Sequence, residues 1–285
     1  MENNNVKYLN KLHREILIVM DEIVRVCNKH HLRYYLVGGS LLGAVRHNGF
    51  IPWDDDLDIA MPRDDFEKLI LLAEKELNST FALEWITTDA KYCHPFAKIY
   101  NKNTSFQERY MMGLNKIGIF VDIFPLDTSA KYNTGLEFRK QLIKRINSAI
   151  LAKNTDHISF RYLHHHILSS FFSMKFMHKT MCNIMISSKN SGCTHYANFG
   201  SQYKLKKQTM PIEWYGDGVS AKFEDRFFTI PSNYTEVLTS IYGPHYMEIP
   251  PESKRRCHYP EKVVFSDGIT MEFNKPQHIV TVEEQ

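Results

Sequence analysis

Three aspartates, Asp54, Asp56 and Asp58, alternate with other residues in the segment WDDDLDIAM at residues 53–61. If this segment is a β-strand, the three carboxylates share one face and lie about 6.5–7 Å apart along the backbone. Carboxylates at that spacing repel one another unless a cation lies between them. Such oxygen ligands suit Mg²⁺ or Mn²⁺. The pattern therefore predicts a Mg²⁺ or Mn²⁺ site on this strand.

Other interpretations of this acidic segment are an exposed surface loop and a calcium-binding loop. The apolar residues that flank the acids, among them Ile51, Trp53 and Leu57, are not typical of an acidic surface loop. A calcium loop of the EF-hand type needs a central glycine and a distant glutamate, which this spacing lacks. The metal-binding strand is the interpretation that fits the surrounding residues best.

A glycine turn, Gly38-Gly39-Ser40, precedes the acidic segment and follows a predicted strand at residues 32–37. A helix is predicted from residue 41, so the backbone amides of the turn would lie at a helix N-terminus, which favours phosphate groups. No Gly-Lys-Ser/Thr follows, so this is not a Walker loop. Such a turn alone is often purely structural. It indicates phosphate binding here because the predicted acidic strand comes next in the chain.

A fourth aspartate, Asp122, lies within the apolar segment GIFVDIF at residues 118–124, which predicts a strand ended by Pro125. A buried aspartate is costly unless it binds a cation or hydrogen-bond donors. The alternative is an aspartate at a strand end that caps a turn. Together with the three acids above, Asp122 is predicted to be a further metal ligand.

The remaining pattern alternates helices and strands. Apolar residues three and four apart predict a first helix over residues 9–26. Asp64 is placed to cap a helix that follows the acidic strand. The other predicted elements are strands at 81–87 and 96–100, helices between 134 and 189, strands near 218–230 and a helix near 234–242. This order indicates an α/β (α+β) core with a small mixed sheet and a largely helical C-terminal extension.

Composition limits the class of protein. Of the 285 residues 43% are hydrophobic and 24% are charged, which is typical of a globular chain. No apolar run reaches the roughly 20 residues of a membrane-spanning helix. The five scattered cysteines suit reduced thiols, so we expect a cytoplasmic protein. Residues 157–212 contain no acidic residue, which indicates a basic surface.

The segment GGSLLGAVRHNGFIPWDDDLDIAMPRDDFEKL, at residues 38–69, closely resembles the signature of the LicD/fukutin family. VDIFPLD at 121–127 resembles it too, as does FAKIYNKNTSF at 96–106, with Lys98 and Thr104 at matching positions. Weaker similarity follows in FED at 223–225 and in the segment 242–258, although Pro244-His245 stand where the pattern has an acid.

This resemblance implies a nucleotidyltransferase-fold catalytic core at residues 1–130. Residues 131–285 are expected to form a mainly helical extension with short strands. The stretch 131–210 matches nothing in the family pattern, so this extension is expected to hold the acceptor-binding region. Asp54, Asp56, Asp58 and Asp122 would be the metal ligands. The residues expected to bind substrate are Gly38, Gly39, Ser40, Arg46, Lys98 and Thr104, and Arg46 has the alternative of being a plain surface cation.

The resemblance further implies transfer of a phosphorylated alcohol, such as phosphocholine, from a CDP-alcohol donor to a glycan or a lipid-linked glycan. An acceptor hydroxyl would attack the distal phosphorus and expel CMP. Asp56, Asp58 and Asp122 are the catalytic candidates, and either Asp58 or Asp122 would be the base. No nucleic acid is expected as a partner.

Two other functions stay open at this point. The same fold and acids would serve a nucleotidyltransferase that moves NMP from an NTP, and the product would be pyrophosphate instead of CMP. A non-catalytic scaffold for glycan-modifying enzymes is the other alternative, although such a protein has no physical reason to keep four clustered aspartates.

A peripheral membrane contact, on the inner face of the membrane, is a separate hypothesis. Phe171, Phe172 and Phe176 lie among Lys175 and Lys179, a composition that suits an anionic lipid surface. The competing interpretation is a set of core aromatics beside solvated lysines.

Overall fold

The structure is a computed structural model that describes residues 2–108, 117–154, 170–188, 192–255, 257 and 260–272, with side chains from Tyr8 onward. The helices are α1 (Glu2–His30), α2 (Gly38–His47), α3 (Arg63–Glu76), α4 (Thr134–Asn154), α6 (Met174–Met185), α7 (Ile212–Tyr215) and α8 (Tyr234–Tyr242), with short 3-10 turns η2 (Leu205–Gln208) and η3 (Glu252–Lys254). The strands are β1 (Tyr35–Leu36), β2 (Asp58–Pro62), β3 (Phe81–Glu84), β4 (Ala97–Asn101), β5 (Ser105–Gln107), β6 (Phe120–Ser129), β7 (His195–Ala197), β8 (Thr209–Pro211), β9 (Val219–Phe223), β10 (Arg226–Ile230), β11 (Lys262–Val264) and β12 (Thr270–Glu272).

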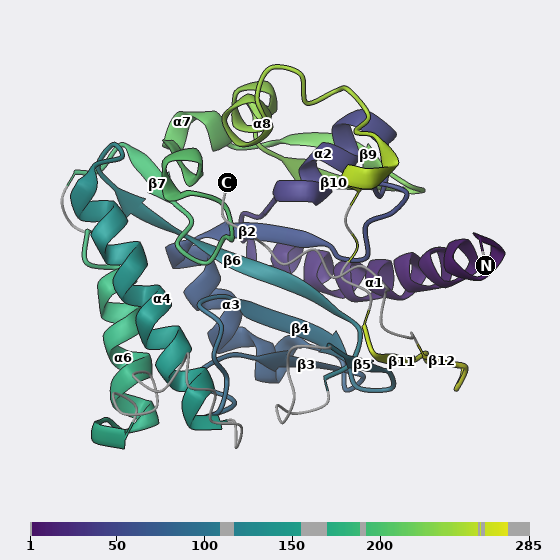
Figure 1. Cartoon of the computed structure of the whole chain (residues 1–285), viewed down its shortest axis with the longest axis horizontal. Coiled ribbons are helices and arrows are strands. Elements are labelled where there is room, and N and C mark those ends of the chain that lie inside the picture. The colour runs from purple at the N-terminus through teal and green to yellow at the C-terminus, as the bar shows by residue number, and fades with distance from the viewer. Residues whose placement is uncertain are drawn as a thin grey trace.

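A mixed sheet of seven strands forms the centre of the fold (Figure 1). Its strand order is β1-β2-β6-β4-β3, and the last residues of β6 continue into β7 and β8. Only β2 and β6 run parallel, whereas the other neighbours are antiparallel. The ten-residue strand β6 thus lies at the centre of the sheet. It pairs with β2, which comes before residue 130 in the chain, and with β7, which comes after it.

Helices α1 and α3 pack against this sheet, where α1 crosses behind it in Figure 1. The first helix is confirmed, and its predicted apolar stripe is buried in the main hydrophobic cluster: Leu9, Leu12, Ile16, Val19, Ile23 and Val26. The same cluster contains side chains from β2, β4, β6 and the β9–β10 hairpin. One core therefore joins α1, the sheet and the C-terminal hairpin.

The strand predicted over residues 53–61 is shorter in the structure, because β2 begins only at Asp58. Its neighbours explain the difference: β1 pairs with β2 only at Ile59 and Ala60, and β6 pairs with it from Asp58 onward. Residues 54–57 belong to no strand and form an irregular loop, although the carbonyl of Leu57 accepts a hydrogen bond from Asp122 N. The acids at Asp54 and Asp56 thus precede the strand instead of lying in it.

Two predicted element ends were also wrong. Pro125 was expected to end its strand, but β6 continues to Ser129. Pro125 lies between Ile123, the last partner of β4, and Asp127, the first partner of β7, so its missing N–H costs no ladder bond on that side. Asp64 was expected to cap α3, but the helix begins at Arg63 and Asp64 lies in its first turn.

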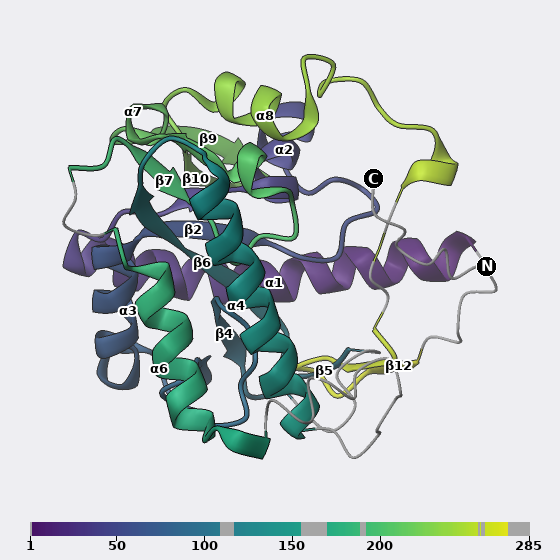
Figure 2. The same ribbon diagram turned by 60° about the vertical axis from the view of Figure 1, so that its left-hand side comes forward.

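Helices α4 and α6 lie side by side as an antiparallel pair that projects beyond the sheet (Figure 2). The helix predicted after residue 134, the strands near 218–230 and the helix near 234–242 are confirmed as α4, β9–β10 and α8. The helical prediction for 158–189 is confirmed for α6, and the rest of it lies outside the described residues. None of the described helices combines the length and apolar character that crossing a membrane requires.

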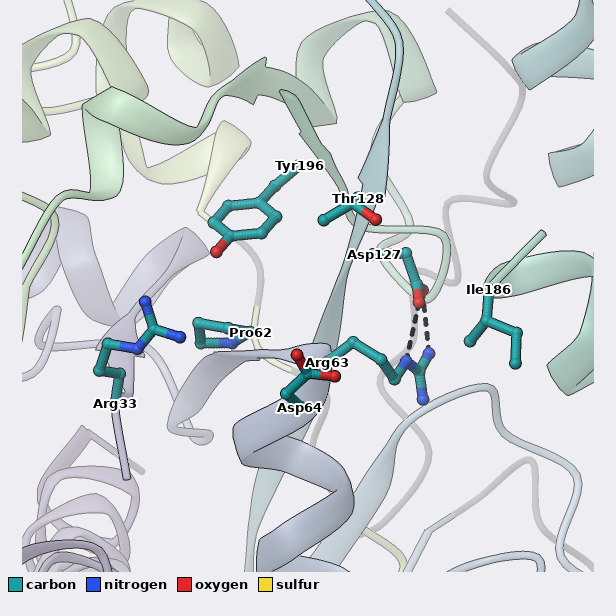
Figure 3. Close-up of a pocket in the computed structure, with 8 residues that line it drawn as sticks. All are labelled: Arg33, Pro62, Arg63, Asp64, Asp127, Thr128, Ile186 and Tyr196. Atoms are coloured by element: carbon teal, nitrogen blue, oxygen red, sulfur yellow. Dashed lines mark hydrogen bonds and ion pairs between the residues drawn. The ribbon is translucent and has the colours of Figure 1, made fainter. Parts of the chain in front are cut away.

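One buried ion pair joins the far ends of the two parallel strands. Arg63, directly after β2, donates from Nε and Nη2 to the two carboxylate oxygens of Asp127 in β6, at 2.7 and 2.9 Å (Figure 3). The two side chains are only 7% and 1% exposed. A buried pair with such bidentate geometry leaves an uncompensated charge if one partner is removed.

We expect the substitution Arg63→Met to lower the free energy of unfolding by about 3–5 kcal/mol, because Asp127 would keep its buried charge without a partner. Urea denaturation followed by circular dichroism measures this. Arg226→Met is the matched control, since its partner Asp21 is about half exposed and the loss of this pair should cost about 1 kcal/mol or less. The double variant R63M/D127L should recover much of the loss, and equal losses in R63M and R226M would contradict the assignment.

Candidate active site

The first residues of the parallel pair place two aspartates side by side. Asp58 in β2 is the register partner of Asp122 in β6, and Asp122 N donates to the carbonyl of Leu57 at 3.1 Å. Aligned residues of neighbouring strands point to the same face of a sheet, so the two carboxylates lie on one face. The sheet thereby brings together acids that are 64 positions apart in the chain.

The pKa of Asp58 is raised well above its ordinary value, first by burial and then by the carboxylates of Asp56, Asp122 and Asp54. The pKa of Asp122 is raised to about 6, mainly by burial, although Lys98 opposes that rise. The four predicted acids thus lie close enough to influence one another. Clustered acids with raised pKa values are typical of functional sites, because folding alone gives no reason to gather them.

Lys98 supplies positive charge to this cluster. It is the register partner of Asp122 on the other side, and its Nζ donates to Asp122 Oδ1 at 2.8 Å. Burial lowers the pKa of Lys98, but Asp122 and Glu108 outweigh it and raise the pKa above the ordinary value. The side chain is 2% exposed, and its Nζ lies 3.4 Å from the centre of the Phe120 ring. Lys98 therefore stays charged inside the site.

Two further acids near Lys98 were not predicted from the sequence. Glu108 Oε1 lies 3.6 Å from Lys98 Nζ, and Glu84 in β3 is the register partner of Lys98. Burial and Asp89 raise the pKa of Glu84 to about 7. A strand register could have indicated Glu84, but the sequence alone does not show which strand pairs with which.

The glycine turn forms the first turn of α2, three residues earlier than predicted, and packs beside the acids. Gly38 has a φ of +55°, and a Cβ added there would lie 3.5 Å from Asp58 Oδ2. A Cβ on Gly39 would lie 2.6 Å from Asp54 Oδ2, which is too close. Glycines are thus needed for the helix N-terminus to approach the carboxylates. Ser40 Oγ accepts a hydrogen bond from Asp58 N at 2.8 Å and so holds the start of β2.

The irregular loop at residues 54–57 is held by a residue that sequence reasoning missed. His13 of α1 places its Nε2 2.7 Å from the carbonyl oxygen of Asp54, and its ring stacks on Phe50 at 3.9 Å. Because a carbonyl only accepts, the neutral ring donates from Nε2, and burial lowers the pKa of His13 in agreement with that form. The only signal in the sequence is a histidine beside the apolar stripe of α1.

Glu224 holds the other end of the loop that leads from α2 to the acids. Its Oε1 accepts from Phe50 N at 3.0 Å, and its own N–H donates to the carbonyl of Asn48 at 2.7 Å. A Cβ on Gly49 would lie 2.1 Å from that Oε1, so a larger residue there would displace the Glu224 carboxylate. Glu224 belongs to the FED segment noted in the sequence, which is thus a support for the acidic loop.

Comparison with known proteins agrees with this geometry. The family model "LicD/FKTN/FKRP, nucleotidyltransferase domain" matches residues 31–148, which include the glycine turn, the four aspartates and Lys98. The chain is 29% identical over 264 residues to the lipopolysaccharide cholinephosphotransferase LicD of Haemophilus influenzae, covering 85% of this chain and 92% of that protein. Residues 31–148 therefore match the LicD/fukutin family model, and the chain as a whole is similar to LicD.

More distant relatives match only a short segment. The human ribitol 5-phosphate transferase FKRP is 49% identical over 43 residues, which are 15% of this chain and 9% of that protein. An uncharacterized protein of Rickettsia prowazekii, RP689, is 45% identical over 47 residues, or 16% of this chain and 18% of that protein. These short matches support the family, whereas the LicD match extends along most of the chain.

Arg46 and Thr104, two residues that the LicD/fukutin pattern suggests for substrate binding, make hydrogen bonds within the protein. Arg46 donates from Nη1 to the backbone oxygens of Tyr246 and Glu248, both at 3.0 Å. Thr104 is buried, and its hydroxyl donates to Asn101 O and accepts from Ile119 N, both at 2.7 Å. These bonds hold the 246–248 segment and the β4–β5 turn in place.

Within the part of the chain that the structure describes, no three His, Cys, Asp or Glu side chains are arranged to hold one metal ion. The metal ligands therefore stay a prediction. A cavity of about 210 Å³ lies elsewhere, at the far ends of β2 and β6 (Figure 3). Pro62 lines it, roughly 13 Å along β2 from Asp58, and the lining residue Arg63 is paired with Asp127. This cavity therefore lies apart from the acid cluster.

We expect Asp58→Asn to stabilise the metal-free protein at pH 8. The folded-state pKa of Asp58 is raised, so wild-type stability falls as the pH rises from about 4 through that raised pKa, and asparagine lacks this penalty. In EDTA at pH 8, D58N should melt at a higher temperature than the wild type, by roughly 2–4 °C for each kcal/mol of added stability. This difference in melting temperature should vanish near pH 4. Asp217→Asn, at an exposed position, is the control. A less stable D58N at pH 8 would contradict the clustering of charge.

We expect His13→Ala to loosen the acidic loop, because Asp54 O loses its donor and Phe50 loses a stacked ring. Hydrogen exchange measured by mass spectrometry should become about tenfold faster in peptides covering residues 48–58, which corresponds to about 1.4 kcal/mol. Peptides from β3 and β4 should not change. Arg14→Ala, the exposed neighbour on α1, is the matched control. Unchanged exchange in the loop of H13A would refute this role.

Proposed function

We propose that the protein transfers a phosphorylated alcohol from a CDP-linked donor to a hydroxyl group of a cell-surface glycan or its lipid-linked precursor, and releases CMP. The names of its relatives, a lipopolysaccharide cholinephosphotransferase and a ribitol 5-phosphate transferase, support a phosphotransferase. The observation that carries the proposal is the meeting of Asp58, Asp122 and Lys98 beside the first turn of α2. Phosphoryl transfer needs cation-binding carboxylates and phosphate-binding groups at one place.

The cofactor that we propose is Mg²⁺ or Mn²⁺, held by Asp54, Asp56, Asp58 and Asp122. The oxygens of these carboxylates are hard ligands, which suit such an ion, and a cation would relieve the like charge that, together with burial, raises the pKa of Asp58. Gly38 and Gly39 leave room beside two of these carboxylates. When bound, the ion would polarise the phosphoryl oxygen and stabilise the charge on the attacking and leaving oxygens.

The protein's own groups would bind and orient the reactants. Lys98 holds Asp122 through its Oδ1 and adds positive charge for the donor phosphates. The first-turn amides of α2, at Gly38, Gly39 and Ser40, favour an anion because no side chain caps this helix. Asp122 or Asp58 would take the proton from the acceptor hydroxyl, since both lie on the same face of the sheet. Asp56, which raises the pKa of both, would complete the catalytic set.

Transfer of NMP from an NTP is the second candidate, because the matching family model is described as a nucleotidyltransferase domain. The same carboxylates would serve attack at the proximal phosphorus. The two reactions differ in their products, which are pyrophosphate for NMP transfer and CMP for transfer of a phospho-alcohol.

We expect the purified protein, given Mg²⁺ or Mn²⁺, an acceptor extract and a panel of CDP-alcohols and NTPs, to release CMP from one CDP-alcohol. Phosphorus NMR distinguishes CMP from pyrophosphate and identifies the donor. Asp56→Asn should lower the rate by at least about a hundredfold, because loss of a ligand charge weakens metal binding. Asp21→Asn, a surface acid that pairs with Arg226, should keep full activity.

Pyrophosphate released from an NTP would replace the proposal with nucleotidyl transfer. If no donor reacts, calorimetric titration with Mg²⁺ or Mn²⁺ separates two cases. Binding that D56N loses would keep the metal assignment and indicate a missing acceptor. Absence of binding in the wild-type protein would overturn the metal assignment and favour a scaffold.

A further inference from the structure

Three exposed phenylalanines, Phe171, Phe172 and Phe176, lie just before α6 and in its first turn, and the end of α6 that carries them is at the bottom of Figure 1. Phe171 is 77% exposed, Phe176 52% and Phe172 39%, and the rings of Phe172 and Phe176 stack with centroids 5.1 Å apart. Their neighbour Met177 is buried, as are Met181 and Met185 further along α6. The helix therefore uses methionines for its core face and leaves the aromatic rings outside, so these rings are not part of the core.

Positive charge surrounds these rings. Lys175 and Lys179 are exposed on α6, and Lys153, at the end of α4, donates from Nζ to the carbonyl of Phe172 at 2.8 Å. The described segment 170–188 contains no aspartate or glutamate. We define the lipid-facing patch as these three phenylalanines and three lysines.

The patch has a rigid base that leads toward the acid cluster. Met177 packs on Cys93, Ala149 and Ile150, and Asn154 donates to the carbonyl of Lys91 at 2.6 Å. The buried ring of His178 lies 2.7 Å, through Nε2, from the carbonyl of Tyr92. The loop that receives these contacts leads directly into β4, which carries Lys98. The patch is thus fixed to the same segment that forms one wall of the site.

Its composition favours an anionic lipid surface over a second copy of this chain. With roughly 200 Å² for each ring, the exposed fractions amount to about 300–350 Å² of aromatic surface, far below the roughly 800 Å² per partner of a stable dimer. A symmetric dimer would also bring the lysines of both copies together. Aromatic rings at the acyl boundary with lysines at the headgroups form a common pattern of peripheral membrane binding.

We propose that the lipid-facing patch rests on a membrane surface rich in anionic phospholipid. The rings would enter the headgroup region and the lysines would contact the lipid phosphates. This binding does not depend on the proposed reaction, and its measurement needs no donor or acceptor. In a phosphotransferase it would bring the active site to acceptors that a membrane holds.

The test is co-sedimentation of the full chain with vesicles of 30% phosphatidylserine in phosphatidylcholine, at 50 mM NaCl. We expect binding that is lost in pure phosphatidylcholine and at 500 mM NaCl, because salt screens the lysines. F171S/F176S should weaken the binding at least about tenfold, and K175Q/K179Q about 25-fold, from roughly fivefold for each lysine. Phe138→Ser, a 68% exposed phenylalanine near the other end of α4, is the matched control and should bind as the wild type does.

Failure of the wild-type protein to bind these vesicles at low salt would overturn the proposal. So would equal weakening by F138S and F171S/F176S, because the binding would then not be specific to the patch. Light scattering on the protein without vesicles tests whether a second copy of the chain covers the patch. A dimer that the substitutions F171S/F176S dissociate would show that it does. Turnover of a soluble donor and acceptor by F171S/F176S should equal that of the wild type, which separates this inference from the proposed reaction.

Discussion

The parallel pairing of β2 with β6 is the constraint on which the site depends. It is the only parallel pair in the described sheet, and its first rung joins Asp58 to Asp122. The antiparallel registers of β6 with β4 and of β4 with β3 continue that rung to Lys98 and Glu84. One row across four strands thus carries three acids and a single lysine, on one face of the sheet. A slip of one residue in any register would move a member of this row to the opposite face.

Such a row is unfavourable for folding, and contacts elsewhere offset its cost. At the far end of the same two strands, Arg63 and Asp127 form a bidentate pair that fixes the register of β2 against β6. The acidic loop before β2 is not part of the sheet, and it is held by His13 of α1 and, through Phe50, by Glu224 of the β9–β10 hairpin. Supports therefore come from both ends of the chain, which is why a site near residue 54 needs a segment beyond residue 200.

Local patterns predicted much of this arrangement. The apolar period of α1, the strands around Ala97–Asn101 and Phe120–Ser129, the glycine turn and the α/β class follow from spacing and residue type. What spacing could not predict is which distant groups meet. In the sequence His13 is an ordinary helix residue, and only the fold places its ring against Phe50. The pairing of β2 with β6 likewise begins at Asp58 and not at residue 53, which the alternation of acids does not show. Arg46 and Thr104 have side chains that could bind phosphate, but in the structure both donate hydrogen bonds to backbone carbonyls.

The charged residues of the 38–69 and 121–127 segments divide into two kinds by how their charge is balanced. Arg63 and Asp127 neutralise each other, and this pairing is sufficient reason for both in a chain that only has to fold. Asp58 and Asp122 instead lie beside one buried lysine, Lys98, and burial with repulsion from Asp56, Asp122 and Asp54 raises the pKa of Asp58 well above its ordinary value. A neutral residue of similar size at position 58 would remove that penalty, so stability gives no reason for an acid there. A cationic ligand does give one, because it converts the repulsion into binding energy, and this is the physical argument for a metal-dependent reaction at the first rung of β2 and β6.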